Sequence, residues 1–309
     1  MSVTLAQMKA VEALSRTGKF SAAAEELGIS QPTVSSQVQA FEQLCKRRIF
    51  QRKGHTVKVA AGAQELIAKI RVTLKCLADV NEALYSEARM ERGTLGVGFS
   101  AHRLIMPALT AFVRRYPAIH INTQGGPSLS LLGDVLNGDL DLAAVSMPLA
   151  DERLFCEEIL RSRIVIYGPK GHPALQGSAL TLQQQLAPEK LVLWNRMSGT
   201  RSTLDLAARQ AGVTLNCVLE VATLDVAYAS AAAGIGLGCA IEGEVQADSN
   251  IDVVPLADPE LSIGHYLVCL PECREHAAVE AFFGIARAHY GLAGGPVPGD
   301  GSIDHRQNL

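Results

Sequence analysis

The sequence predicts a multidomain protein with a small, mostly helical N-terminal domain, one long linker helix and a larger α/β region of two lobes. Three observations predict this fold class: helical apolar spacing in residues 1–60, an unbroken helical pattern over 62–89, and alternating strand and helix patterns from residue 93 onward. At 309 residues the chain is long enough for two or three domains. Hydrophobic residues, at 48%, can fill their cores.

Charge is distributed unevenly along the chain. Residues 1–60 hold nine Lys and Arg against four Asp and Glu, whereas residues 93–309 hold 14 against 22. A basic front module attached to an acidic one suggests that the front end meets a polyanion. A solvated basic face explains the charge equally well.

Composition also excludes several classes of protein. No stretch reaches the ~18 consecutive apolar residues of a membrane span, and the first residues resemble the first helix of a domain rather than a secretory signal. The seven cysteines lack the spacing of a disulfide framework or a zinc site, and no catalytic motif is recognisable. We therefore expect a cytoplasmic protein that is not an enzyme and has no metal, cofactor or membrane partner.

Local signals predict three helices in residues 1–45. A capping box at Thr4 begins a helix that ends near Gly18. Ser21 is expected to cap a second helix, and Gly28 supplies the turn after it. Ser30 begins a third helix.

The third helix has two different faces. Val34, Val38 and Phe41 recur at i, i+4 and i+7 and form one buried stripe. The opposite face carries short, uncharged polar side chains, which can hydrogen-bond base edges in a major groove. Two helices, a glycine turn and a further helix form the helix-turn-helix layout, in which the later helix enters that groove.

A basic hairpin is predicted after the third helix. Apolar Ile49-Phe50 precedes the basic stretch Lys53-Gly54-His55, and apolar and polar residues alternate from Val57 to Val59 after it. We therefore expect a small β-hairpin wing whose cations neutralise phosphates. A helical hairpin with a charged rim is the structural alternative.

The segment 62–89 predicts a dimerisation helix with a heptad seam. The seam positions are Ala63, Ile67, Ile70, Leu74, Leu77, Asn81, Leu84 and Ala88. A partner helix is the economical explanation, and a core helix of one subunit is the alternative. Glu91-Arg92-Gly93 is expected to end this helix and act as a hinge.

The C-terminal region repeats one pattern. Strands and helices alternate over residues 94–146 and again over 190–241, which implies two parallel sheets. Two such lobes joined by crossing strands describe a solute-binding clamshell.

The N-terminal stretches FSAAAEELGISQPTVSSQVQAFEQL and IFQRKGHTVKVAAG closely resemble the winged helix-turn-helix of the LysR-type transcriptional regulators. Later stretches such as LNGDLDLAAV, SGTRSTLDLAARQAG and AAAGIGLGCAI resemble the family's effector domain, an α/β two-lobed unit like the periplasmic binding proteins. The resemblance covers about residues 4–290 and implies sequence-specific DNA binding controlled by an effector. Three departures are Ser36 in place of Arg, Lys46 in place of Gly, and Ala60 in place of a capping Thr.

The resemblance implies the residues that contact DNA. They are Gln31, Pro32, Thr33, Ser35, Ser36, Arg52 and Lys53.

Effector residues are expected beyond the carboxyl ends of the strands, where helix N-termini favour anions. The resemblance places Ser100, Ser128 and Thr200 in the cleft. The full expected set is Ser100, Ala101, His102, Ser128, Thr200, Arg201 and Thr223. We expect a small carboxylate, phosphonate or sulfonate. Alternatively, the hydroxyls cap helices structurally, and Arg201 pairs with Asp205.

We expect a DNA-binding domain at 1–61, a linker helix at 62–90, an effector domain at 91–292 and a flexible tail at 293–309. The first lobe should comprise 93–166 and 269–292, and the second 167–268. Expected partners are a pseudo-palindromic operator in double-stranded DNA, RNA polymerase, a small anionic metabolite, and further copies of the chain in a homodimer or homotetramer. A solute-binding protein without a regulatory role is the alternative function.

Overall fold

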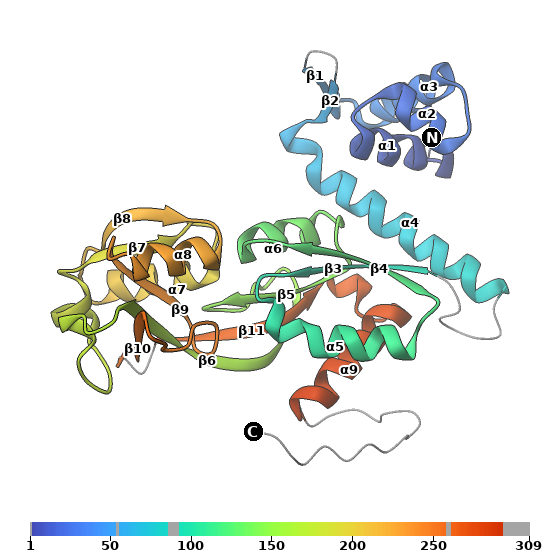
Figure 1. Cartoon of the computed structure of the whole chain (residues 1–309). Helices are drawn as coiled ribbons and strands as arrows, with labels where there is room; N and C mark the ends of the chain where they lie inside the picture. The colour runs from blue at the N-terminus through green and yellow to red at the C-terminus, as the bar shows by residue number, and fades with distance from the viewer. Residues whose placement is uncertain (1, 54–55, 86–92, 258–260, 293–309) are drawn as a thin grey trace.

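The computed structural model describes residues 2–53, 56–85, 93–257 and 261–292. A helical N-terminal domain sits on one end of a long helix, and a two-lobed α/β region lies beside that helix (Figure 1). The elements up to the long helix are α1 (Leu5–Thr17), α2 (Phe20–Leu27), α3 (Gln31–Cys45), β1 (Phe50–Lys53), β2 (Thr56–Val59), η1 (Ala61–Ala63) and α4 (Gln64–Tyr85).

Turn chemistry positions the three N-terminal helices. The capping box predicted at α1 is present, and the glycines after α1 and α2 adopt the left-handed conformation. The Ser30 side chain caps α3 by accepting the N–H of Thr33. The prediction for Ser21 is wrong, because the N-cap of α2 is Lys19, two residues earlier, and the helix begins at Phe20, which packs against the N-terminal core.

Helix α3 is anchored on its apolar side and tied to the hairpin. Val38 and Phe41 are each 4% exposed in the N-terminal core. The Glu42 carboxylate accepts the backbone N–H groups of Ile49 and Phe50 at 2.8 and 3.2 Å. The β1–β2 wing predicted from the sequence therefore has a fixed position beside α3.

The first half of the predicted heptad seam is already buried within the chain. Ala63, Ile67 and Ile70 are 1–4% exposed and belong to the N-terminal core, and Leu74 packs against it. The small domain itself covers these positions, so their burial does not require a partner helix. The side chains of Asn81 and Leu84, and the whole of Ala88, Glu91 and Arg92, lie outside the described part of the chain.

The C-terminal region contains the two predicted βαβαβ units. The first comprises β3 (Gly93–Phe99), α5 (His102–Arg115), β4 (Ile119–Gly125), α6 (Ser128–Leu136) and β5 (Leu142–Met147). The second comprises β7 (Lys190–Trp194), α7 (Gly199–Gln210), β8 (Asn216–Val221), α8 (Leu224–Ala232) and β9 (Leu237–Ile241). The remaining elements are β6 (Phe155–Pro169), η2 (Pro173–Leu175), η3 (Leu182–Leu186), β10 (Ile251–Pro255), β11 (Ser262–Cys269), η4 (Pro271–Cys273) and α9 (Ala277–Tyr290).

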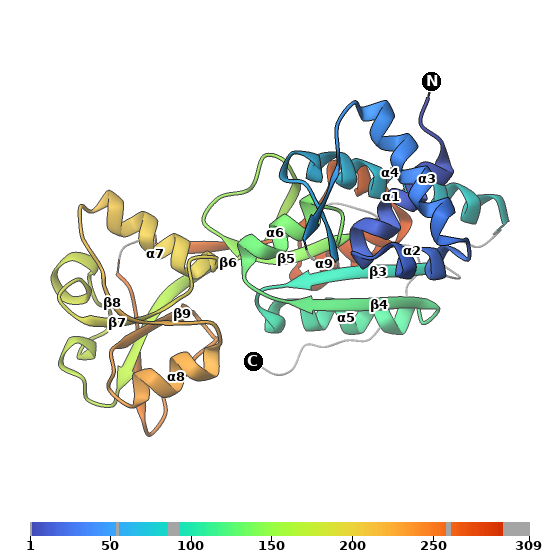
Figure 2. The ribbon, with the colours of Figure 1, turned by 90° about the horizontal axis from the view of Figure 1, so that it is seen from above.

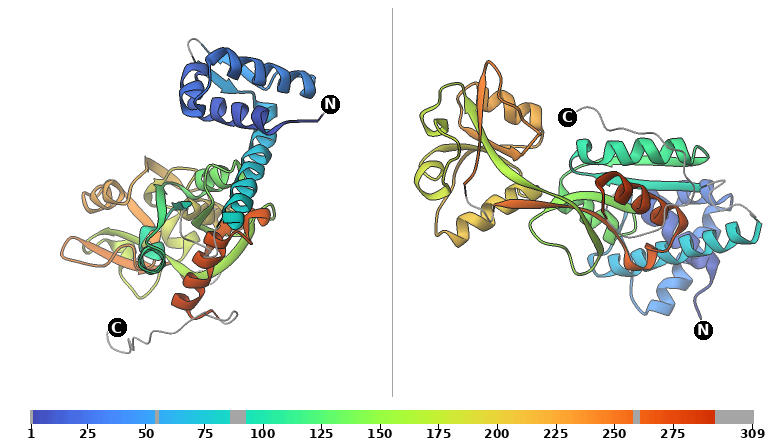
Figure 3. Two further views of the ribbon diagram at one scale, coloured as in Figure 1. Left: turned by 90° about the vertical axis from the view of Figure 1, so that its right-hand side faces the viewer. Right: turned by 90° about the horizontal axis from the view of Figure 1, so that it is seen from below.

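Two long strands join the lobes. The strand order is β4-β3-β5-β11-β6-β9-β7-β8, and β10 pairs with β6. Strands β6 and β11 run antiparallel and cross from one lobe to the other (Figures 2 and 3). We expected the return crossing near residue 268, but β11 already pairs with β5 of the first lobe from Gly264 onward.

Helices cover both faces of each lobe. In the first lobe α5 and α9 pack on the face that carries Leu142 and Ala144, and α6 packs on the face that carries Ala143 and Val145. In the second lobe α7 and α8 cover opposite faces in the same way. This alternation follows from the two-residue period of a strand and places Ser146 on the same face as Ala144.

Candidate nucleic-acid interface and ligand cleft

The polar face of α3 is exposed. All five residues predicted to contact DNA from this helix face solvent, and Val34 on the opposite side is fully buried. These exposed residues are Gln31, Pro32, Thr33, Ser35 and Ser36. The face is therefore free to approach a duplex.

Two of the hydroxyls on this face are held by local hydrogen bonds. The Thr33 hydroxyl lies 2.7 Å from the Ser30 hydroxyl, and Ser36 donates to the Thr33 carbonyl at 2.9 Å. These bonds fix the first turn of α3, where the backbone N–H groups favour an anion.

A cationic segment follows α3 at its C-terminal end. Lys46, Arg47 and Arg48 are exposed, and none of them forms an ion pair with another described residue. Lys46 has φ 51°, the left-handed conformation expected at a position that favours glycine. Arg52 and Lys53 belong to β1, but their side chains lie outside the described part of the structure.

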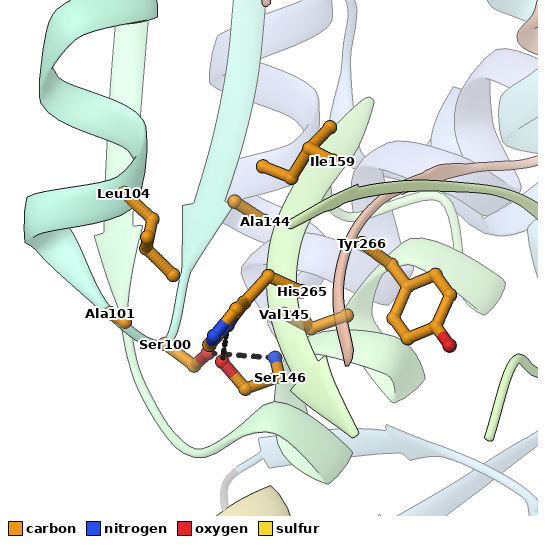
Figure 4. Close-up of a pocket in the computed structure, with 9 residues that line it drawn as sticks. All are labelled: Ser100, Ala101, Leu104, Ala144, Val145, Ser146, Ile159, His265 and Tyr266. Atoms are coloured by element: carbon orange, nitrogen blue, oxygen red, sulfur yellow. Dashed lines mark hydrogen bonds between the residues drawn. The ribbon is translucent and has the colours of Figure 1, made fainter. Parts of the chain in front are cut away.

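The polar groups of the clamshell converge on Ser146, near the carboxyl end of β5. Its backbone N–H is shared by the hydroxyl oxygens of Ser100 and Ser128, at 3.2 Å each. Because both hydroxyl oxygens accept a hydrogen bond from this N–H, each hydroxyl can donate its own hydrogen bond to another acceptor. Ser100 and Ala101 line a pocket with Ser146 and His265 (Figure 4).

His265 lies at the base of this pocket on the crossing strand β11. Its Nδ1 is 2.8 Å from the Ser146 hydroxyl, and its Nε2 is 3.0 Å from the Ser162 hydroxyl on β6. Burial lowers the pKa of His265 to about 4, so the ring is neutral near pH 7. A neutral ring donates through one nitrogen and accepts through the other.

The second lobe touches the first at this same point. A Cβ placed on Gly199, the first residue of α7, would lie 1.7 Å from the carbonyl oxygen of Ser146. The N–H of Leu129 at the start of α6 donates to the Met197 carbonyl at 3.0 Å. Thr200 is 6% exposed beside this contact. The start of α7 therefore closes directly onto the end of β5.

The other predicted effector residues interact with partners other than Ser146. The Arg201 guanidinium bonds the Asp205 carboxylate at 2.8 Å and the Trp194 carbonyl at 3.2 Å, which is the alternative pairing considered above. His102 is exposed and near Glu244, whose pKa is raised by burial.

Thr223 is exposed at the N-cap of α8, and its hydroxyl bonds Asp225 and lowers the pKa of that carboxyl.

Sequence reasoning missed the two residues at the centre of the cleft. Ser146 ends the predicted strand LDLAAVS, so the rule that ligands bind beyond strand ends could have identified it. His265 lies inside the buried strand β11, and no local pattern distinguishes it from a core residue.

Neither a metal-binding cluster nor a membrane-spanning helix is found in the described ranges. They contain no group of three or more side chains able to hold a metal ion. Their helices are too short or too polar to span a bilayer.

Family comparisons cover both parts of the chain. Residues 5–64 match the family described as a bacterial regulatory helix-turn-helix protein of the lysR family. Residues 88–291 match the LysR substrate binding domain. The RuBisCO operon transcriptional regulator of Allochromatium vinosum is 27% identical over 239 residues, which cover 77% of this chain and 79% of that protein. The transcriptional activator CmpR of a Synechocystis strain is 24% identical over 76% of this chain and 78% of its own length.

Solved structures share the complete fold. A full-length OxyR variant from Pseudomonas aeruginosa superposes with a TM-score of 0.73 at 18% identity, over 93% of this chain and 98% of that one. Full-length CbnR in complex with its target DNA superposes with a TM-score of 0.52 at 17% identity, over 92% and 98%.

Proposed function

The chain belongs to the LysR family of transcriptional regulators, and from this premise we propose that a small oxyanion held between its lobes controls how α3 reads an operator. The observation that carries the effector half is the convergence of Ser100, Ser128 and the start of α7 on Ser146. The match to a DNA-binding domain favours regulation over solute binding alone.

The DNA half rests on an exposed polar helix followed by cations that form no ion pair with another described residue. Gln31 and Ser35 carry the hydrogen-bonding groups suited to base edges. Lys46–Arg48 can neutralise phosphates, which position the helix without reading sequence. The chain would act as a homodimer or homotetramer in the cytoplasm, with two or more α3 helices on a pseudo-palindromic site and RNA polymerase alongside.

A mobility-shift titration with the DNA upstream of the protein's own gene tests this half. The double variant Gln31→Ala/Ser35→Ala should lose about 1–3 kcal/mol of preference for that DNA per base contact removed. Arg47→Ala should weaken binding to every duplex and reduce the slope of affinity against salt by about one. Gln176→Ala, at an exposed position in the second lobe, is the matched control. Unchanged selectivity in the double variant would contradict the assignment of α3.

Hydroxyl donors, not cationic side chains, should hold the effector. Among the described residues Ser100 and Ser128 donate no hydrogen bond, and both accept from the Ser146 N–H. Arg201 is occupied by Asp205. An oxygen atom that accepts hydrogen bonds from both hydroxyls fits this arrangement.

Thermal unfolding in the presence of sulfate, inorganic phosphate and a panel of mono- and dicarboxylates tests the effector half. A true effector at 100 times its Kd stabilises the chain by about 2.7 kcal/mol. Ser128→Ala should abolish this gain, whereas Ser130→Ala, at an exposed position of the same helix, should keep it. Equal stabilisation of both variants by the same acid would place its site elsewhere.

A further inference from the structure

Helix α4 lies against the first lobe of its own chain as well as against the N-terminal domain (Figures 1 and 3). We infer that Arg71 and Lys75 on α4, together with the turn 137–141 of the first lobe, form an intrachain latch that fixes the effector domain against the DNA-binding domain. This inference goes beyond the proposed function, which concerns the cleft and α3.

Arg71 joins three parts of the chain. Its guanidinium donates to the Asn137 carbonyl at 2.9 Å and to the Asp139 carboxylate, both in the first lobe. On the other side it donates to the Ser15 hydroxyl at 3.2 Å and lies 3.8 Å from the Glu12 carboxylate, both in α1. The side chain is only 13% exposed. One cation is therefore shared between the DNA-binding domain and the effector domain.

The turn is shaped to receive this side chain. Gly138 has φ +69°, and a Cβ placed on it would lie 3.3 Å from the Cβ of Arg71. A side chain at this position would be strained and would push Arg71 away. The close approach therefore depends on glycine.

A second ion pair lies one helical turn further along α4. The Lys75 ammonium bonds the Asp141 carboxylate, whose other oxygen accepts the Gly96 N–H at 2.7 Å. Asp141 is thereby tied to β3 and cannot follow Lys75 if the helix moves. Cys76 on α4 also lies 3.6 Å from Nε2 of His276 at the start of α9.

The latch is suited to opening. Partial burial raises the pKa of Asp139 even though Arg71 lies beside it, so desolvation opposes the ion pair. Ion pairs of this kind contribute little net stability, because the cost of desolvation offsets much of the attraction. A modest change in the first lobe could therefore release it.

Strand β5 connects the latch to the cleft. Asp141 directly precedes β5, and Ser146 lies near its other end. Five residues of strand span about 17 Å. The contact of Gly199 with Ser146 and the contact of Lys75 with Asp141 thus act on one rigid strand. Ile67 and Ile70 of α4 belong to the core that also holds α3, so α4 contacts both the latch and the helix proposed to read DNA.

Hydrogen exchange of the full chain, without DNA or effector, tests the latch. Asp139→Asn should increase exchange about fivefold, both in the turn 137–141 and in residues 71–77 of α4, since a loss of about 1 kcal/mol corresponds to that factor. Asp139→Glu keeps the charge and should retain the wild-type protection. Asp151→Asn, which removes a first-lobe ion pair with Arg153, should leave both segments unchanged.

Two results would overturn the inference. One is wild-type exchange in both segments of Asp139→Asn. The other is faster exchange confined to the turn, because a purely local role for Asp139 predicts no effect on α4. Hydrogen exchange is measured without DNA or effector, so its result does not depend on whether the chain binds either one. An experiment can therefore contradict the latch without contradicting the proposed function, and the reverse.

Discussion

Acidification should destabilise the effector domain through His265. The ring is 1% exposed, and burial lowers its pKa to about 4, with Arg161 lowering it further and Glu158 opposing the shift. In the unfolded chain a histidine has a pKa of about 6.5. Between these two values the unfolded state binds more protons than the folded state. The stability due to a neutral His265 is therefore complete above pH 6.5 and is lost as the pH falls towards 4.

The size of the effect follows from the two pKa values. Between pH 8 and pH 5 this single group should remove about 2 kcal/mol from the free energy of unfolding. Urea titrations followed by the fluorescence of Trp194, the only tryptophan of the chain, measure this quantity in the effector domain. His265→Gln cannot titrate, so its loss between the two pH values should be smaller than the wild-type loss by that amount.

His120→Gln, the same substitution at an exposed position, is the matched control for the change of side chain. Each variant is compared with itself at two pH values, which cancels any change in the free energy of unfolding that the substitution causes at every pH. Equal losses of stability for His265→Gln and the wild type between pH 8 and pH 5 would show that His265 is not a buried neutral base.

Three further substitutions test individual contacts. The Tyr167 hydroxyl is buried without a hydrogen-bond partner among the described residues. Tyr167→Phe should therefore raise the free energy of unfolding by about 1 kcal/mol in urea titrations. A lower free energy of unfolding would show that the hydroxyl has a hydrogen-bond partner in the protein. Lys46→Gly should relieve left-handed backbone strain and stabilise the DNA-free protein by about 0.5 kcal/mol, whereas Lys46→Ala should not. Gly199→Ala should separate α7 from Ser146 and destabilise the protein by about 2 kcal/mol in thermal unfolding. Gly284→Ala, at a helical position where a Cβ meets no other atom, should not destabilise the protein. Equal effects of the two substitutions would exclude the close contact at Gly199.

Local chemistry made the N-terminal domain predictable. Ser30 and Gly28 act through bonds within a few residues of themselves, so sequence alone predicts the start of α3 and the turn before it. Ser21 failed because a hydroxyl near a helix start competes with the burial of its neighbour Phe20, and burial depends on the tertiary core.

The seam of α4 shows a different limit. A stripe of apolar residues every three or four positions indicates that one face of a helix is covered, but not by what. Ile67 and Ile70 are covered by the protein's own N-terminal domain. A second helix from a partner would produce the same spacing, and only the tertiary packing distinguishes the two.

The cleft could be predicted only in part, because its residues are far apart in sequence. Ser100 and Ser128 follow strands, so the rule for open α/β sheets makes them candidates from the sequence alone. Their convergence on one N–H of Ser146 depends on how three strands align. The role of His265 depends on β11 returning beside β5, which no local pattern encodes.

The two halves of the chain differ in net charge, so they should respond differently to salt. Residues 93–309 carry an excess of acidic side chains, and in the described cleft no Lys or Arg contacts Ser100, Ser128 or Ser146 through a hydrogen bond. An anion would therefore be attracted through short-range hydroxyl and backbone donors rather than through net charge, and such contacts are only weakly screened by salt. DNA binding, in contrast, releases counterions from phosphates and weakens steeply as salt rises. Raising the salt concentration should consequently separate the two activities, because the effector would remain bound at concentrations that already dissociate the operator.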